Sequence, residues 1–417
     1  MTKSEEIAES VFMLIRSGEL TGRLASEQKL AKQYGVSPVT AAKALNLLRE
    51  RGVVTRVHGS GTYVSEPEQT VVKIMFNHSF AEKLFAQLEA YFPQVRVENV
   101  NSMEEADAVV FSTTVPFFPG EYFLPWPRER IDRLKQEGRL YPKIFEFHDA
   151  RGAVWGLPFF FSPDILRYNK KLMQQINPGF EPYEMTFEDM LELQRKLPDD
   201  IALYAGNLSP LLLSFVYNLA GDGSAGPSIF RKAVALKDQL RYSSDISLFE
   251  EGRALFSSST RYCAIRSGKG IDAAPMVMLN GRRVCHASSE ALMIRNTTRH
   301  SELLFDMAEA LFKPEIQQLI SDARRAIPAD VVIAAKSLDS SVFRDDIFFN
   351  EIKNIDFAHR HMSDSVNLCF STVIKKMVQE RITADEFLRE VEAAYLFEKK
   401  RQSALLPFTV SSGAAGF

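Results

Sequence analysis

Residues 26–64 read SEQKLAKQYGVSPVTAAKALNLLRERGVVTRVHGSGTYV, and this stretch decides the fold of the N-terminal part. Ser26 and Ser37 each precede a run with helical spacing of apolar residues, and Tyr34-Gly35-Val36 forms a short turn between the two runs. Serine is a preferred N-cap, and Pro38 occupies the first helical position, where its missing N–H costs nothing. We therefore predict two short helices in a helix-turn-helix, the second ending before Gly52.

Further elements flank this helix pair. Upstream, Ile7, Val11, Leu14 and Ile15 recur at helical spacing, which predicts an amphipathic helix over residues 4–17. Downstream, residues 53–57 and 62–64 read as strands around a glycine-containing tip, which predicts a hairpin. A hairpin placed after a helix-turn-helix is a wing, so the sequence predicts a winged helix-turn-helix.

Charge is unevenly distributed along the chain. The formal net charge is −3 at pH 7, yet the six cations between Lys29 and Tyr63 face Glu50 alone. A basic face in an otherwise acidic protein is an electrostatic footprint for phosphate. We therefore expect a double-stranded DNA operator as a partner, and the alternative is a winged helix used for protein contacts.

The same residues resemble the GntR family of winged-helix regulators. The resemblance is carried by residues 24–31 (LASEQKLA), 34–37 (YGVS) and 59–64 (GSGTYV). Ala25 departs from the usual proline of the family, and Pro38 and Ala42 stand where many members carry arginines that touch DNA. The resemblance implies a DNA-binding transcription regulator, and these departures leave its operator sequence open.

The resemblance also implies which residues meet DNA. Ser37, Val39, Thr40 and Lys43 should lie at the major groove, Ser26 and Arg49 near phosphates, and the hairpin tip in the minor groove. Hydroxyls and a lysine at a helix start can reach base edges or phosphates, and glycines let the backbone approach closely. The predicted DNA-binding residues are Ser26, Lys29, Ser37, Val39, Thr40, Lys43, Arg49, Arg56, His58, Gly59, Ser60 and Gly61.

A second domain follows a polar joint at residues 66–69. Residues 71–76 and 107–111 read as buried strands, and a helical pattern at 80–92 separates them. This alternation predicts an α/β domain, in which ligands bind at the carboxyl ends of strands. Asn77, His78, Thr113 and Thr114 occupy two such ends.

Several later motifs resemble the extracellular solute-binding proteins of sugar ABC importers. They are residues 154–161 (VWGLPFFF), 166–173 (LRYNKKLM), 185–190 (MTFEDM), 249–256 (FEEGRALF), 289–294 (SEALMI) and 326–329 (AIPA). The resemblance implies a two-lobed, periplasmic-binding-protein-like (type II) sensor domain, in which the chain crosses between lobes near Phe161 to Leu166, Ala291 to Asn296 and Ile327 to Asp330. It also implies a cleft that closes on a small solute, most plausibly a sugar.

Sugar recognition needs aromatic faces and fixed hydrogen-bonding groups. The predicted ligand-binding residues are Asn77, His78, Thr113, Thr114, Phe159, Phe160, Asn207, Arg266, Ser289 and Glu290. Each has an alternative interpretation: three consecutive aromatic residues at 159–161 cannot all face one cleft, Trp155 suits core or hinge packing, and His78 suits a loop. The glycine-rich residues after Arg266 could cradle an anion.

The predicted architecture is thus α/β with an N-terminal winged helix. We expect a DNA-binding domain at 1–66 and a ligand-sensing domain at 71–402, with lobe one at about 71–162 and 294–328 and lobe two at about 166–290 and 330–402. We expect a homodimer, because paired winged helices gain affinity by tethering.

The remaining expectations concern compartment and chemistry. The start of the chain has no apolar stretch behind a basic segment, and Cys263, Cys285 and Cys369 have no C-x-x-C spacing. We expect a cytoplasmic protein with no membrane partner, no metal, no cofactor and no enzymatic activity. Two alternatives stay open: an aminotransferase-like domain that binds pyridoxal phosphate, and a C-terminal domain that only mediates dimerisation.

Overall fold

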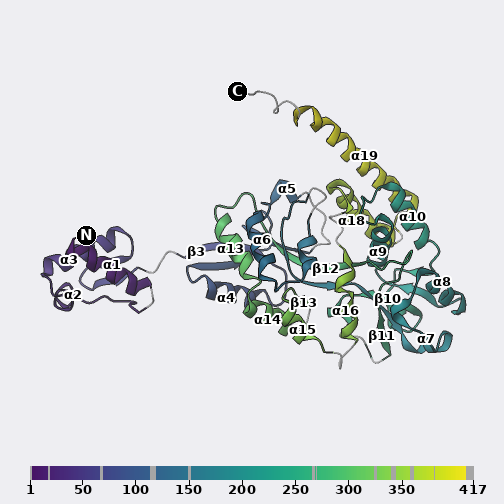
Figure 1. The fold of residues 1–417 in the computed structure, drawn as a ribbon, viewed down its shortest axis with the longest axis horizontal. Coiled ribbons are helices and arrows are strands. Elements are labelled where there is room, and N and C mark those ends of the chain that lie inside the picture. Colours follow the sequence, from purple (N-terminus) through teal and green to yellow (C-terminus); the bar gives the residue numbers. More distant parts are fainter. Residues whose placement is uncertain are drawn as a thin grey trace. The chain divides into compact units, whose positions relative to one another are not determined.

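The computed structural model describes residues 2–16, 19–65, 69–112, 119–148, 152–264, 268, 270–323, 326–339, 344–356, 361–379 and 381–409 (Figure 1). The chain divides into two compact units. The first comprises Met1–Val71 with Phe92–Arg96, and the second comprises Val72–Tyr91 with Val97–Phe417.

The first unit contains three helices and a hairpin. The helices are α1 (Lys3–Arg16), α2 (Glu27–Tyr34) and α3 (Pro38–Glu50), and the strands are β1 (Val54–Val57) and β2 (Gly61–Val64). β1 and β2 pair antiparallel, with Val57 opposite Gly61 at the turn. Gly35 ends α2 in the left-handed conformation (φ 64°), which turns the chain toward α3. The predicted winged helix-turn-helix is confirmed.

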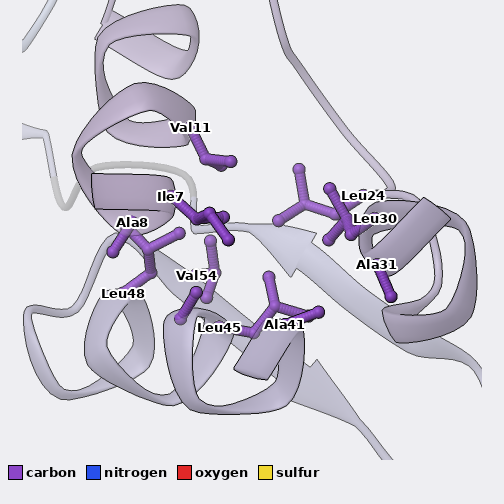
Figure 2. Close-up of a cluster of buried hydrophobic side chains, with 11 residues drawn as sticks. Ile7, Ala8, Val11, Leu24, Leu30, Ala31, Ala41, Leu45, Leu48 and Val54 are labelled. Carbon is purple, nitrogen blue, oxygen red and sulfur yellow. The ribbon is translucent and has the colours of Figure 1, made fainter. Parts of the chain in front are cut away.

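The core of the first unit consists of apolar side chains from all three helices. Ile7 and Val11 of α1 meet Leu45 and Leu48 of α3, and Leu30 joins them from α2 (Figure 2). Val54 of β1 closes the cluster on the side of the hairpin. Each of these side chains lies on the buried stripe that its helical or strand spacing predicts.

The second unit contains two mixed sheets, and the larger has seven strands. Its order is β13-β6-β12-β5-β3-β4, and β14 also pairs with β12. The bounds are β3 (Thr70–Met75), β4 (Val95–Asn99), β5 (Ala108–Ser112), β6 (Pro158–Pro163), β12 (Cys285–Ile294), β13 (Ile327–Pro328) and β14 (Ile355–Asp356). β3 and β5 run parallel, as expected for the β-α-β pattern around α4 (Ala81–Tyr91).

The smaller sheet has five strands in the order β11-β7-β10-β8-β9. They are β7 (Ile165–Asn169), β8 (Ala202–Ala205), β9 (Tyr242–Ser243), β10 (Ala254–Ser259) and β11 (Ile271–Ala274). Each sheet is the centre of one lobe.

Helices pack around both sheets. Those not yet named are α5 (Pro119–Tyr122), α6 (Arg128–Glu137), α7 (Lys170–Ile176), α8 (Phe187–Lys196), α9 (Ser209–Ala220), α10 (Pro227–Lys237), α11 (Ser247–Glu250), α12 (Arg261–Ala264), α13 (Ser301–Ala310), α14 (Pro314–Asp322), α15 (Val331–Ser337), α16 (Asp345–Glu351), α18 (Asp364–Val378) and α19 (Ala384–Thr409). Within the described part of the chain, no helix is both long and apolar enough to cross a membrane.

The chain passes from the larger to the smaller sheet between β6 and β7, at Asp164. This agrees with the crossing predicted near Phe161 to Leu166. The crossing predicted near Ala291 to Asn296 is wrong, because β12 already pairs with β6 from Ala287 and with β5 up to Ile294. The apolar run at 291–294 is therefore the middle of a sheet, and the chain enters the larger sheet several residues earlier.

Candidate functional site

The first residues of α3 are fixed by a serine cap. The Ser37 hydroxyl accepts the backbone N–H of Thr40 at 3.2 Å and lies 2.8 Å from the Thr40 hydroxyl. The opposite stripe of the helix is buried and consists of Ala41, Ala44, Leu45 and Leu48. The cap thus holds the start of α3 rigid, and it occupies the two hydroxyls of α3 that were predicted to lie at the major groove.

The outer face of α3 presents an apolar residue followed by cations. Val39 is 66% exposed, although valine is usually buried. Lys43 and Arg49 are exposed on the same helix, and Lys29 is exposed on α2. None of these three cations has an ion-pair partner among the described residues. They are therefore available to an anion.

The hairpin tip is built from two glycines with positive φ. Gly59 has φ 74° and Gly61 has φ 127°, conformations that a residue with a Cβ rarely adopts. The Ser60 hydroxyl lies 2.6 Å from the Tyr63 hydroxyl, which ties the tip to β2, and His58 is exposed beside it. Nothing in the described part of the chain lies within 4 Å of a Cβ placed on Gly59, so this part of the tip can approach another molecule closely.

A hollow of about 810 Å³ lies between the start of α2 and the hairpin. Ser26, Lys29, Arg56 and Gly61 line it, and all four are among the predicted DNA-binding residues. Arg56 is already paired, because its Nη2 donates to Glu27 Oε1 at 2.9 Å. A phosphate in this hollow would compete with Glu27 for Arg56.

Arg23, which was not predicted as a DNA contact, also lines this hollow. Its backbone bridges to Tyr63, and its Nε would lie 3.1 Å from a Cβ placed on Gly61, so the guanidinium covers the hairpin glycine. Arg23 precedes both the cation-rich segment, which starts at Lys29, and the motif typical of the family, which starts at Leu24. Only the pairing with β2 reveals its place.

In the larger lobe, aromatic rings gather where β3 ends. The ring centroid of His78 lies 4.4 Å from that of Phe80 and 5.8 Å from that of Phe160. Phe160 in turn lies 5.6 Å from Phe80 and 4.8 Å from Phe159. The structure therefore brings His78 together with Phe159 and Phe160 although about eighty residues separate them in sequence.

The structure places both phenylalanines in the core. Phe159 has no exposed surface and Phe160 is 4% exposed. The predicted stacking role of Phe159 is therefore corrected to core packing, since a ring with no exposed face offers no surface to a ligand. Phe160 lies at the border of the core, beside the half-buried His78.

Glu290 is a half-buried carboxylate in the middle of the larger sheet. In β12 it lies opposite Phe160 on β6 and Ser112 on β5. No hydrogen-bond or ion-pair partner of Glu290 occurs among the described residues. Burial raises the pKa of Glu290 to about 7, because the charged carboxylate loses hydration. Its neighbour Ser289 is buried, and the Ser289 hydroxyl also has no partner among the described residues.

The remaining predicted ligand residues are placed as follows. Asn77 is exposed directly after β3, and Asn207 is exposed after β8 in the smaller lobe. The Asn207 side-chain oxygen accepts the backbone N–H of Ser209 at 3.0 Å at the start of α9, which fixes its orientation. Thr113, Thr114 and Arg266 lie outside the described residues.

Two buried polar pairs near the crossing between the lobes were not predicted. His286 Nδ1 lies 2.6 Å from Asp164 Oδ2, and both residues are almost fully buried. The Arg261 guanidinium donates two hydrogen bonds of 2.7 Å to Asp345 and others to the carbonyls of Ala326 and Ser337. No local pattern reveals them, because the partners are distant in sequence.

The described residues contain no group of three or more His, Cys, Asp or Glu side chains placed to hold a metal ion. On its face of the larger sheet Glu290 lies opposite Phe160, and His78 packs against Phe160, whereas Ser289 belongs to the opposite face because successive strand residues alternate. A carboxylate, an imidazole and an aromatic ring can bind a small polar molecule by hydrogen bonds and ring contacts.

Comparison with known proteins assigns the first unit. Residues 3–64 match the sequence profile of the bacterial regulatory proteins, gntR family. Over 65 residues the chain is 38% identical to the HTH-type transcriptional repressor NagR of Bacillus subtilis (strain 168). Over 81 residues it is 40% identical to the mannosyl-D-glycerate transport/metabolism system repressor MngR of Escherichia coli (strain K12). The matched segments are 15% and 19% of this chain and span 27% and 33% of those relatives.

Solved structures similar to this chain include several sugar-binding proteins. The sugar-binding protein MalE from Xanthomonas citri has a TM-score of 0.62 at 17% identity, over 80% of this chain and 98% of that one. Maltose-bound MalE3 of T. maritima has a TM-score of 0.57 at 14% identity, over 79% and 99%. The N-terminal unit is thus a GntR-type winged helix, and most of the chain has the two-lobed fold of the sugar-type solute-binding proteins.

Proposed function

We propose that this chain, which joins a GntR-type winged helix to the fold of a sugar-binding protein, is a DNA-binding transcription regulator controlled by a small solute, most plausibly a sugar. The observation that carries the proposal is the presence of both units in one chain. The regulator acts in the cytoplasm as a homodimer on a double-stranded operator, without a cofactor or an enzymatic activity of its own.

The DNA contacts divide into two kinds. Lys29, Arg49 and Arg56 hold phosphates, and Ser26 adds its hydroxyl beside them. Val39 and Lys43 face the major groove from the outer side of α3, and the hairpin tip enters the minor groove. On binding, Arg56 exchanges Glu27 for a DNA phosphate. Arg23, which lines the same hollow, contacts the same stretch of the DNA backbone.

The start of α3 shapes the sequence preference. Because the Ser37 and Thr40 hydroxyls hold each other at 2.8 Å, their first role is to fix the angle of the helix. Base edges are then read mainly by the exposed Val39 and Lys43. An apolar side chain in the major groove fits the methyl group of thymine.

The solute site in the larger lobe centres on Glu290, with His78 and Asn77 at the end of β3 as further contacts; Ser289, on the other face of β12, belongs to a site only through its backbone. A carboxylate that lacks a protein partner can accept hydrogen bonds from sugar hydroxyls. Asn207 contributes from the smaller lobe. Thr113, Thr114 and Arg266, which lie outside the described residues, stay predicted contacts. Closure of the two lobes about the crossing at Asp164 couples solute binding to the DNA-binding units.

A solute screen with full-length protein tests the sensor half of this proposal. We expect one sugar or related solute to raise the melting temperature in a concentration-dependent way, because a ligand selective for the folded state stabilises it. Glu290→Ala should abolish the shift, and Glu251→Ala, an exposed glutamate of the smaller lobe, is the matched control. A shift that survives Glu290→Ala would move the site elsewhere.

Selection of binding sites from random duplex DNA tests the other half. Lys43→Ala and Val39→Ala should weaken binding to the selected site, whereas Lys3→Ala on α1 removes the same charge as Lys43→Ala away from α3 and should have little effect. Affinity should fall steeply with added salt, because phosphate neutralisation releases counterions. Unchanged affinity in both α3 variants would rule out α3 as the recognition helix.

A further inference from the structure

Over residues 384–400, whose side chains the structure describes, the last helix, α19, buries one side and exposes the other. It lies beside α18 and α10 in the second unit (Figure 1). Phe387 and Val391 are fully buried, Ser365 Oγ donates to Glu398 Oε2 at 2.6 Å, and Arg231 pairs with Glu392 at 2.9 Å. The helix is therefore held firmly along this side.

An open groove runs along α19 where it faces α18. α18 and α19 enclose a hollow of about 650 Å³ whose apolar walls include Val373, Ile382, Ala393 and Phe397. Phe397 is 59% exposed and Leu396 is 51% exposed. Two adjacent large apolar side chains beside an apolar groove are unusual on a free surface and mark an interaction site.

The exposed residues along this side form one stripe with a charge gradient. Glu386, Glu390, Ala393, Phe397 and Lys400 follow one another at alternating intervals of four and three residues, so they share one helix face. Carboxylates stand at one end of the stripe and an ammonium at the other. Ala393, the smallest side chain, stands midway between Glu386 and Lys400.

We propose that this stripe, here called the α19 seam, is the contact face for a second copy of the chain. Two α19 helices would run antiparallel across a two-fold axis at Ala393. Lys400 of each copy then lies opposite Glu386 of the other, one turn from Glu390. The two α18–α19 hairpins together form a four-helix bundle.

Charge decides the direction of the pair. A parallel pair would set Glu386 against Glu386 and Lys400 against Lys400, and like charges in an interface are unfavourable. The antiparallel pair sets opposite charges together at both ends and apolar side chains between them. It also lets Phe397 of each copy reach the groove of the other, beside Val373 and Ile382.

The same gradient favours a second copy over an unrelated protein. A two-fold interface uses one patch twice, so that patch must be complementary to itself when reversed. The α19 seam meets this requirement, and an unrelated partner would not need it. The inference extends the dimer of the proposed function, but it rests on the seam and on neither DNA nor solute binding.

Cysteine cross-linking of the full-length chain tests the position of the axis. In a Cys369→Ser background, Ala393→Cys brings two thiols together across the axis, and mild oxidation should convert most of the dimer into a disulfide-linked species. Asp385→Cys is the control: it lies eight residues from the axis, so its two copies stand about 24 Å apart along the helices at 1.5 Å per residue. Equal cross-linking of both variants, or of neither, overturns the inference.

Charge exchange tests the direction of the helices. We expect Lys400→Glu and Glu390→Lys each to raise the dimer dissociation constant about tenfold or more in sedimentation experiments, because each places like charges together twice. The double variant should recover part of this loss. Unchanged constants in the single variants, or a double variant weaker than both, overturn the inference. A dimer that fails these tests while still binding DNA leaves the proposed function standing.

Discussion

The two units of the chain are stabilised by different chemistry. The first unit has a wholly apolar core that runs from Ile7 to Val54. The second unit also buries polar pairs: the ion pair of Arg261 with Asp345, 84 residues apart, and the hydrogen-bonded pair of His286 with Asp164, 122 residues apart. The core of the first unit is built from residues close together in sequence. The buried polar pairs of the second unit join residues from distant parts of the chain.

The difference has an energetic consequence. An apolar core loses stability gradually as side chains are trimmed. A buried ion pair stabilises little as a pair, yet removal of one partner leaves an uncompensated charge in the interior. The second unit should therefore be the more sensitive to single substitutions at its buried polar sites.

The largest expected effect is at Arg261. Arg261→Met leaves Asp345 buried without its cation and should lower the free energy of unfolding of the second unit by about 3–5 kcal/mol. Calorimetry of the full chain measures this, with the transition of the first unit as the internal control. The double variant Arg261→Met, Asp345→Leu should recover part of the loss, and an equally destabilised double variant would show that the charge is not the cause.

Leu48 provides the counterpart in the first unit. It is fully buried on α3, so Leu48→Ala should destabilise this unit by about 2–5 kcal/mol through lost burial and a residual cavity. Chemical denaturation monitored by DNA binding measures this change. Leu47→Ala is a matched control on the half-buried side of the same helix and should cost less. Equal losses would contradict the assigned core.

Glu290 adds a pH dependence that the first unit should lack. Because its pKa is raised from 4.5 to about 7, the folded state holds a proton that the unfolded state has already released between these values. The contribution of Glu290 to the free energy of unfolding is therefore largest below about pH 4.5. It falls as the pH rises through about 7, by up to about 1.4 kcal/mol per pH unit.

Glu290→Gln should flatten this slope between pH 5 and 7. Denaturant titrations of both proteins across that window give the comparison. A variant with the same slope as the native chain would show that the carboxyl group of Glu290 titrates normally.

The smallest expected effect is at the cap of α3. Ser37→Ala removes the acceptor for the Thr40 N–H and should cost the first unit about 1 kcal/mol. Ser37→Asp retains a capping oxygen and should restore stability, although its negative charge should weaken DNA binding. Separate measurements of stability and affinity distinguish these outcomes, and an Asp variant as unstable as the Ala variant would contradict the cap.

The contrast between the units also explains what could be predicted from the sequence. Helical spacing, the serine caps and the hairpin glycines are local, so the first unit was predicted to within a few residues of its observed bounds. The crossing near Ala291 was misplaced because an apolar run at 291–294 suits a hinge and a central strand equally. Sheet register, which is a long-range property, decided between them.

The candidate sites follow the same rule. The DNA face lies on local motifs, whereas Arg23 joins it only through its bridge to Tyr63. Phe159 and Phe160 read as stacking faces because periodicity does not show which side of a strand is covered. Glu290 was predicted through its motif, but its burial, and the absence of a side-chain partner among the described residues, depend on β5 and β6 beside it.

The central claim is that one unit controls the other, and the affinity for the selected operator with and without the solute found by thermal shift tests it most directly. We predict a change of about tenfold in operator affinity, a coupling of about 1.4 kcal/mol, and the same factor in solute affinity when operator is present. The change should be absent in Glu290→Ala and present in Glu251→Ala. A solute that binds the full-length chain but leaves operator affinity unchanged would contradict the account.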